Sequence, residues 1–152
     1  QKIFNNKDSI RFLKTHSCFV NTDEFKFTDR HNTLGVIYIV RDPRNVLTSV
    51  MNHYSLSESD GLKMMNSVYR NLRDVNDNDN YSNYSFISSW SNNYNSWKLS
   101  KNINSLFIKY EDLENDKYKT FSKIVNFTNN IIKKERNKIS PEIRGFFLFF
   151  MI

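Results

Sequence analysis

The sequence is poor in the features of secreted and membrane-spanning proteins. Its 152 residues include one cysteine, Cys18, so no disulfide can form within the chain, and a reducing compartment is the default expectation. The final apolar run, "GFFLFFMI", has eight residues, far fewer than the roughly 20 of a membrane helix. No signal peptide is evident. These absences predict a soluble, cytoplasmic protein with no membrane partner.

Several residue types and motifs are also missing. Alanine is absent and glutamine occurs once, while Asn, Lys, Ile, Phe, Tyr and Ser are abundant. A coding bias toward A/T-rich codons explains this composition better than any function does. The sequence holds no GxxxxGK[ST] loop, which nucleotide kinases use to bind phosphates. It also holds no cluster of His, Cys or carboxylate residues, so we expect no metal cofactor.

Charge is present but unevenly distributed. The formal net charge is +6, and residues 98–144 hold eleven Lys or Arg against six Asp or Glu. This excess lies mainly in "KYKTFSK" and "IIKKERNK", which we expect to be solvated helix faces. Nucleic-acid-binding domains more often show a basic stripe with interleaved aromatic residues. We therefore expect no nucleic-acid partner.

Strand and helix patterns alternate along the chain. Residues 34–40, "LGVIYIV", are apolar throughout, as a strand covered by helices on both faces should be. Polar, turn-rich segments at 21–33 and 76–83 predict loops. The complete set of predictions is strands at 10–16, 34–40 and 105–110 and helices at 43–55, 59–75, 85–99 and about 115–129. This order predicts an α/β domain, a parallel sheet with flanking helices.

Local signals refine two of these helices. Asp42 is a suitable N-cap and Pro43 suits the first helical position, where its missing N–H costs nothing. In the helix at 85–99, four aromatic residues share one face and are expected to pack in the core: Phe86, Trp90, Tyr94 and Trp97. The final segment, "ISPEIRGFFLFFMI", has no clear period, and no element is assigned to it.

Polar clusters follow the three predicted strands. They are Lys14-Thr15-His16, Arg41-Asp42-Pro43-Arg44 and Tyr110-Glu111-Asp112. Ligands of parallel α/β sheets bind at the carboxyl ends of the strands, so neighbouring strands would gather cations, an imidazole and a phenol there. This combination is typical of an anion or nucleotide site. Arg41, where a strand meets a helix N-terminus, is the residue expected to contact a phosphate, whereas Arg44 is expected to be solvated.

Ser49 is a polar residue of the helix predicted at 43–55. It lies seven residues beyond Asp42, which places its hydroxyl about 10 Å along the helix axis. Ser49 therefore cannot cap the helix, and a phosphate that it contacts must lie beside the helix. Considered alone, Ser49 is an ordinary polar helix residue.

Four segments together resemble a known family. "RFLKTH", "VIYIVRDPRNVLTSVMNHYS", "SWSNNYNSW" and "FIKYEDLENDKYKTFSKIVNF" are similar, in this order and spacing, to cytosolic-type sulfotransferases over residues 10–130. The resemblance implies a three-layer parallel sheet with flanking helices, related to the P-loop nucleotide hydrolases. It also implies transfer of a sulfuryl group from 3′-phosphoadenosine 5′-phosphosulfate (PAPS) to a hydroxyl or amine of a small molecule or glycan, without a metal.

The resemblance also implies a role for individual residues. Arg41 and Ser49 would bind the 3′-phosphate of PAPS, and Tyr110 would contact the adenine side of the nucleotide. His16 would be the general base that takes the acceptor's proton, since imidazole is the side chain whose ordinary pKa lies closest to neutral pH. Lys14 would stabilise charge on the transferred sulfuryl group and on the leaving phosphate oxygen.

Two segments of the family pattern have no counterpart in this sequence. They are the N-terminal phosphate-binding loop with its lysine and the C-terminal Arg-Lys-Gly segment. We therefore expect residues 1–152 to form one incomplete sulfotransferase domain, which need not be active as given. The alternatives are a nucleotide kinase of related fold and a non-catalytic nucleotide-binding fragment or pseudoenzyme. A nucleic-acid binder is the third alternative, supported only by the late basic excess.

Overall fold

The computed structural model describes residues 10–20, 27–73, 84–136 and 145–151. The predicted loop at 76–83 and residues 21–26 of the predicted loop at 21–33 lie outside these ranges. In chain order the elements are β1 (Ile10–Thr15), β2 (Thr33–Val40), α1 (Pro43–Tyr54), α2 (Glu58–Asn66), β3 (Asn71–Arg73), β4 (Tyr84–Phe86), α3 (Trp90–Lys98), β5 (Ser105–Lys109), α4 (Tyr110–Asn115), α5 (Lys117–Arg136) and β6 (Gly145–Met151).

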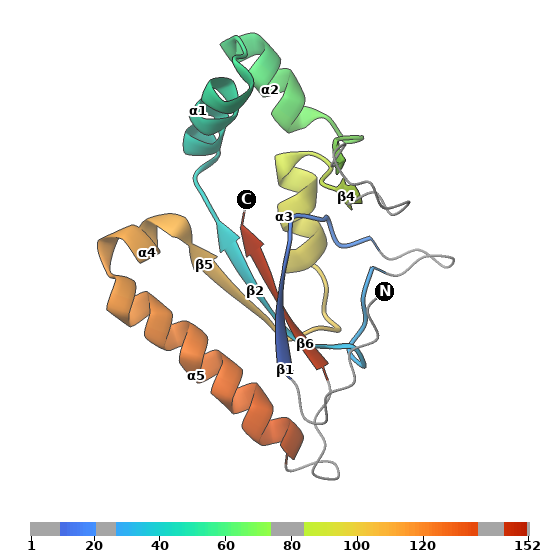
Figure 1. Cartoon of the computed structure of the whole chain (residues 1–152), viewed down its shortest axis with the longest axis vertical. Coiled ribbons are helices and arrows are strands. Elements are labelled where there is room, and N and C mark those ends of the chain that lie inside the picture. The colour runs from blue at the N-terminus through green and yellow to red at the C-terminus, as the bar shows by residue number, and fades with distance from the viewer. Residues whose placement is uncertain (1–9, 21–26, 74–83, 137–144, 152) are drawn as a thin grey trace, which may run out of the picture.

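The larger sheet has the strand order β1-β6-β2-β5, and all of its paired strands are parallel. The predicted parallel α/β fold is therefore confirmed, as are strands close to 10–16, 34–40 and 105–110. Strands β3 and β4 form a separate antiparallel pair. Because the strands of the larger sheet all run the same way, their carboxyl ends meet at one edge (Figure 1).

Alternate residues of β2 point to opposite faces and enter two hydrophobic cores. Val36 and Tyr38 pack with Trp97 of α3 and with Ile103, whereas Ile37 packs with residues of β5 and α5. Val36, Ile37 and Tyr38 are all fully buried. The continuous apolar run of this strand thus reflects helices on both faces, as expected (Figure 1). Burial of Trp97 also confirms the core prediction for that member of the aromatic stripe.

Helix α1 begins where the sequence predicts. The Asp42 side chain accepts a hydrogen bond from the Arg44 backbone N–H, and Pro43 is the first helical residue. Helix α2 packs against α1 at Gly61, where an added Cβ would lie 2.8 Å from Leu47 Cδ1 and 3.1 Å from Met51 Cγ. The small glycine therefore allows the two helices their close approach.

The predicted helix at 59–75 is too long. Helix α2 ends at Asn66, and residues 71–73 form β3 instead. The backbone carbonyl of Arg70 accepts hydrogen bonds from the N–H groups of Ile87 and Ser88, and that of Val68 accepts one from Ser88 Oγ. These tertiary bonds replace the helical bonds that the local spacing favours. Tyr69, which lies within the predicted helix but outside α2, is 83% exposed.

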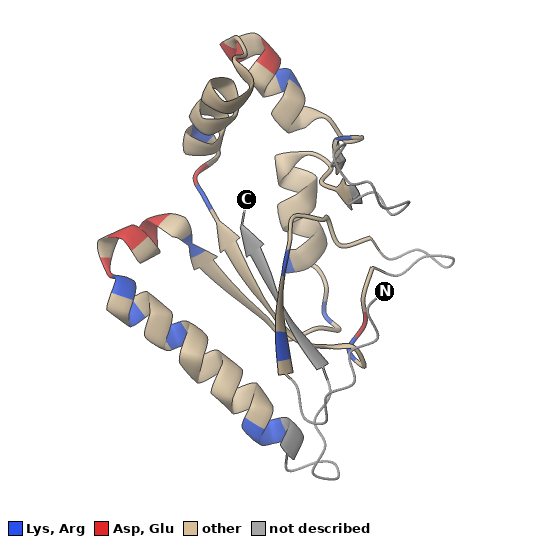
Figure 2. Cartoon of the chain, in the orientation of Figure 1, with Lys and Arg blue, Asp and Glu red and all other residues tan. Residues whose placement is uncertain are grey.

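Two other helix boundaries differ from the predictions. Residues 84–86 form β4, and α3 begins only at Trp90 because Ser88 has a positive φ of 61° and Ser89 acts as the N-cap. Helix α5 continues to Arg136, beyond the expected end near residue 129, and Tyr110 begins α4 rather than ending a strand. The lysines of α5 whose exposure is described are exposed, as expected: Lys117, Lys119, Lys123, Lys133 and Lys134. Figure 2 shows basic positions in blue along this helix.

The final apolar segment, to which no element was assigned, contributes a central strand. Strand β6 pairs with β1 on one side and with β2 on the other. A short apolar run bounded by glycine is consistent with a central strand of a parallel sheet even without a period. An apolar run in which apolar and polar residues do not alternate is therefore itself a sequence signal for a central parallel strand.

Candidate functional site

The parallel strands bring the predicted site residues to one edge of the sheet. Val40, the last residue of β2, pairs with Lys109, the last residue of β5. Arg41 and Tyr110 therefore directly follow two adjacent strands. Lys14 lies near the end of β1, and His16 directly follows the last residue of that strand, Thr15. Strand β6 separates β1 from β2. Neighbouring strands lie about 4.8 Å apart, so the ends of β1 and β2 are about 10 Å apart.

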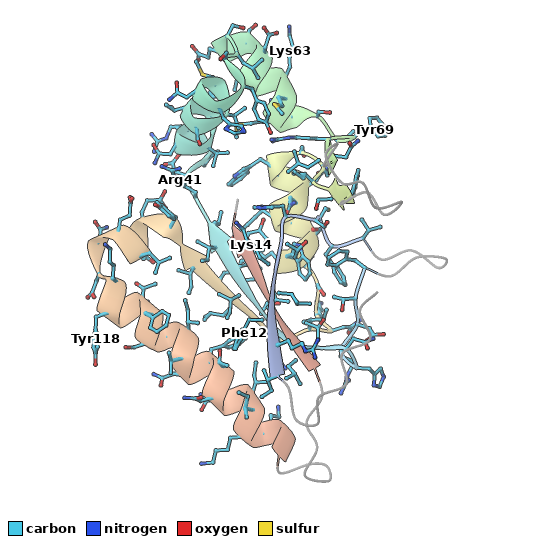
Figure 3. All side chains as sticks on the ribbon, in the orientation of Figure 1. Phe12, Lys14, Arg41, Lys63, Tyr69 and Tyr118 are labelled. Carbon is cyan, nitrogen blue, oxygen red and sulfur yellow. The ribbon has the colours of Figure 1, made fainter. Side chains whose placement is uncertain are left out.

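Figure 3 shows Lys14 on β1 and Arg41 beyond β2, toward the same end of the sheet. Lys14 is exposed and His16 is half-buried. The structure thus brings Arg41 and Tyr110 together, and it places Lys14 and His16 on the same edge, farther along it.

Arg41 and Tyr110 form a cation–π pair. The guanidinium carbon of Arg41 lies 4.9 Å from the centroid of the Tyr110 ring, within the range of a favourable interaction. Arg41 Nε is buried and has no hydrogen-bond partner among the described residues. A buried N–H without an acceptor costs about 1–3 kcal/mol. A guanidinium that retains unused donor capacity at this edge fits an anionic group such as a phosphate.

Arg44 has a different role from Arg41. It is exposed, and its Nη2 lies 2.6 Å from Asp42 Oδ2. Hydrogen bonds from the Arg44 side chain and backbone lower the pKa of Asp42 to about 2. Arg44 therefore lies at the surface, as expected, and its charge is matched by the carboxylate that caps α1.

Glu111 connects the two helices that begin at this edge. Its Oε1 accepts a hydrogen bond from the backbone N–H of Asp42 at 2.9 Å. This bond is the largest cause of the lowered pKa of Glu111, to which the nearby Asn45 side chain also contributes. The start of α1 is therefore fixed to the start of α4, and Arg41 and Tyr110 immediately precede the two bonded residues.

Ser49 is exposed on α1. It lies one turn beyond Asn45, on the same face of the helix. Because the Asn45 side chain is near enough to Glu111 to lower its pKa, that face is directed toward α4. Ser49 is therefore on the side of α1 where Arg41 meets Tyr110, although no contact joins it to either residue.

The chain that follows β1 is held by α3. Asn93 Nδ2 donates to the backbone carbonyls of His16 at 3.1 Å and of Ile87 at 2.8 Å. Asn93 Oδ1 accepts a hydrogen bond from the Tyr38 hydroxyl at 3.0 Å, and Trp97 Nε1 donates to the Ser17 carbonyl at 3.1 Å. Asn93 is fully buried. The backbone at His16 is thus fixed by a buried polar network.

The family model described as "Sulfotransferase domain" matches residues 2–142. The chain belongs to the sulfotransferase domain family. No curated protein matches it significantly. Family membership supports a transferase with a P-loop-like α/β fold, in agreement with the parallel sheet and with the resemblance over residues 10–130.

Two residues of this candidate site had no role predicted from the sequence. Glu111 belongs to a predicted strand-end cluster, but its bond to Asp42 depends on how β2 and β5 pair. Asn93 falls on the same helical face as Trp90 and Trp97. A polar residue within an aromatic stripe is a sequence signal for a buried hydrogen bond, and it could have identified Asn93.

The described parts of the sulfotransferase domain contain neither a cluster of metal ligands nor a membrane-spanning helix. Residues 10–20, 27–73, 84–136 and 145–151 include no group of three or more His, Cys, Asp or Glu side chains placed to hold a metal ion. No helix within these ranges is long and apolar enough to cross a membrane.

Proposed function

We propose that this chain is part of a PAPS-dependent sulfotransferase, with the carboxyl edge of its sheet as one half of the donor site. Residues 1–152 would form a single incomplete domain whose full architecture is a three-layer parallel sheet with helices on both faces. The observation that supports this proposal best is Arg41, whose guanidinium lies against Tyr110 and whose buried Nε has no described partner.

In the proposed site, Arg41 and Ser49 bind the 3′-phosphate of PAPS. The two carboxylates at the start of α1, Asp42 and Glu111, disfavour an anion directly at the helix N-terminus. The phosphate therefore lies beside α1, on the face that carries Ser49. Tyr110 contacts the adenine side of the nucleotide while its ring supports the Arg41 guanidinium.

PAPS supplies the sulfuryl group when bound, and the chain supplies the proton acceptor and a compensating charge. His16 takes the proton from the acceptor's hydroxyl or amine, and the bond from Asn93 to the His16 carbonyl limits backbone movement there. Lys14, exposed near the end of β1, offsets negative charge on the transferred group and on the leaving phosphate oxygen. The acceptor is a small molecule or a glycan.

Isothermal titration with 3′,5′-ADP, the desulfated product, tests the donor site. We expect the Arg41→Met variant to bind about 10- to 100-fold more weakly, because one charged hydrogen-bonding group is worth about 1.5–3 kcal/mol. Arg44→Met is the matched control, since Arg44 is exposed and pairs with Asp42. Its affinity should remain within about twofold of the unaltered protein, as expected for a screened surface charge.

The same titration separates this proposal from the alternatives. Binding of ATP with Mg²⁺ in preference to 3′,5′-ADP would support the kinase alternative. Equal weakening by Arg41→Met and Arg44→Met would contradict a specific phosphate contact by Arg41. Absence of 3′,5′-ADP binding by the unaltered protein would contradict the proposed donor site in this chain.

A further inference from the structure

One carboxylate links the starts of two helices at the carboxyl edge of the β2–β5 pair. Helix α1 begins at Pro43 and α4 begins at Tyr110. Glu111 Oε1 accepts a hydrogen bond from the Asp42 N–H at 2.9 Å. The Asn45 side chain and the Glu111 backbone N–H also help to lower the pKa of the Glu111 carboxyl. The carboxylate therefore lies at the corner where the two helices begin.

This arrangement differs from an ordinary capping box. In a capping box, the third residue of the helix is a Glu or Gln whose side chain accepts a hydrogen bond from the N-cap backbone N–H. The third residue of α1 is Asn45, which is neither Glu nor Gln. The N-cap N–H of Asp42 is satisfied by Glu111, which comes from a different helix. The corner of α1 is therefore complete only when α4 is in place.

The bond at Asp42 also sets the orientation of Arg41. The Asp42 N–H belongs to the planar peptide that joins Arg41 to Asp42. Fixing this N–H fixes the peptide plane, and with it the backbone torsion that directs the Arg41 side chain. Glu111 immediately follows Tyr110 in the chain. The hydrogen bond between Asp42 and Glu111 thus joins the two residues that directly follow Arg41 and Tyr110, the partners of the cation–π pair.

We propose that Glu111 is a positioning residue of the anion site, which holds the β2–α1 corner so that the Arg41 guanidinium stays against Tyr110. The identity of the anion, the 3′-phosphate of PAPS, rests on the proposed function. The positioning of Arg41 does not, because the corner can be observed without a ligand. The two parts can therefore be tested separately.

NMR spectroscopy of the ligand-free protein tests the positioning. We expect the Arg41 side-chain protons to carry an upfield ring-current shift from Tyr110. In Glu111→Ala this shift should be lost, and the Asp42 amide should exchange with solvent about tenfold faster, because its acceptor is gone. Glu114→Gln, at an exposed position on the same helix, is the matched control and should leave both signals unchanged.

The Glu111→Gln variant provides a second test, which does not require the protein to fold with alanine at position 111. Its amide oxygen can still accept the Asp42 N–H, but the bond loses its charge assistance and weakens. The Asp42 amide proton should move upfield, whereas most of the Arg41 ring-current shift should be retained. If a general loss of helix stability were enough to displace Arg41, Glu111→Gln would not be expected to retain the Arg41 ring-current shift. A Glu111→Ala spectrum with Arg41 and Asp42 signals equal to those of Glu114→Gln would overturn the proposal.

Titration of the same variants with 3′,5′-ADP tests the consequence for the site. We expect the dissociation constant to rise about tenfold in Glu111→Ala and at most about threefold in Glu111→Gln, relative to Glu114→Gln. A loss of affinity without any change in the Arg41 signals would contradict positioning as the cause. If the unaltered protein does not bind 3′,5′-ADP, the proposed function fails, and the NMR comparison still decides the role of Glu111.

Discussion

At the scale of single residues, Asn93 connects three separate parts of the chain. Its side chain bonds to the Tyr38 hydroxyl in β2 and to the backbone carbonyls of His16 and Ile87. A buried amide is stabilising only when its donors and acceptor are satisfied. Asn93 therefore serves both the core and the backbone that carries the proposed general base.

Replacement of Asn93 by alanine should destabilise the protein strongly. The change leaves the carbonyls of His16 and Ile87 without this donor, and each unsatisfied buried group costs about 1–3 kcal/mol. We expect the free energy of unfolding, measured with urea, to fall by about 2–4 kcal/mol. Asn95→Ala, at an exposed position of the same helix, should change it by less than about 0.5 kcal/mol. Similar losses in both variants would contradict the role of the network.

Some residue roles followed from the sequence and others did not. Arg41 and Tyr110 were predicted to lie at the same edge of the sheet if their strands are neighbours, and the structure places them in contact. The roles of Glu111 and Asn93 depend on partners 69 and 77 residues away in the chain. Such bonds are fixed by strand pairing and helix docking, which a local pattern does not specify. The assigned chemical roles of Lys14 and His16 remain predictions.

At the scale of helices and strands, the ends are set by a mixture of local and tertiary causes. The start of α1 was predictable because Asp42 and Pro43 act locally. The end of α2 was not, because hydrogen bonds from Ser88 to the 68–70 segment favour the β3–β4 pair over a longer helix. The apolar spacing of 59–75 therefore indicated a helix correctly at its start and wrongly at its end.

The C-terminus of α1 offers a prediction at this scale. Ser55 caps the helix in the left-handed region, with φ 53° and ψ 45°, and its N–H bonds to the Met51 carbonyl. Glycine adopts this conformation without the cost that a Cβ incurs. We expect Ser55→Gly to raise the free energy of unfolding by about 0.5–1 kcal/mol, as measured by thermal or urea unfolding.

Ser57 is the matched control for this prediction, since it lies two residues later and has a φ of −66°. It caps α2 by accepting a hydrogen bond from the Asp60 N–H at 3.2 Å. Ser57→Ala should therefore destabilise the protein by about 1 kcal/mol. Stabilisation by Ser57→Ala, or destabilisation by Ser55→Gly, would contradict these backbone assignments.

At the scale of the whole molecule, β6 joins two parts of the sheet. Strands β2 and β5 pair directly and have α3 and α5 packed on their two faces. Strand β1 has β6 as its only partner among the described strands, and β6 comes from the far end of the sequence. The position of β1 relative to β2, and hence of His16 relative to Arg41, therefore depends on a contact between distant parts of the chain.

Leu148→Pro tests this dependence, because Leu148 is paired with Leu13 of β1 and with Val36 of β2. Proline removes a backbone donor and is tolerated poorly inside a sheet. In amide hydrogen exchange, we expect the β1 amides to lose protection by at least tenfold, while those of β5 change much less, because β5 bonds to β2 and not to β6. The β5 amides serve as the internal control. Equal loss in both strands would indicate a sheet that opens as one cooperative unit, whereas unchanged protection of β1 would contradict the central position of β6.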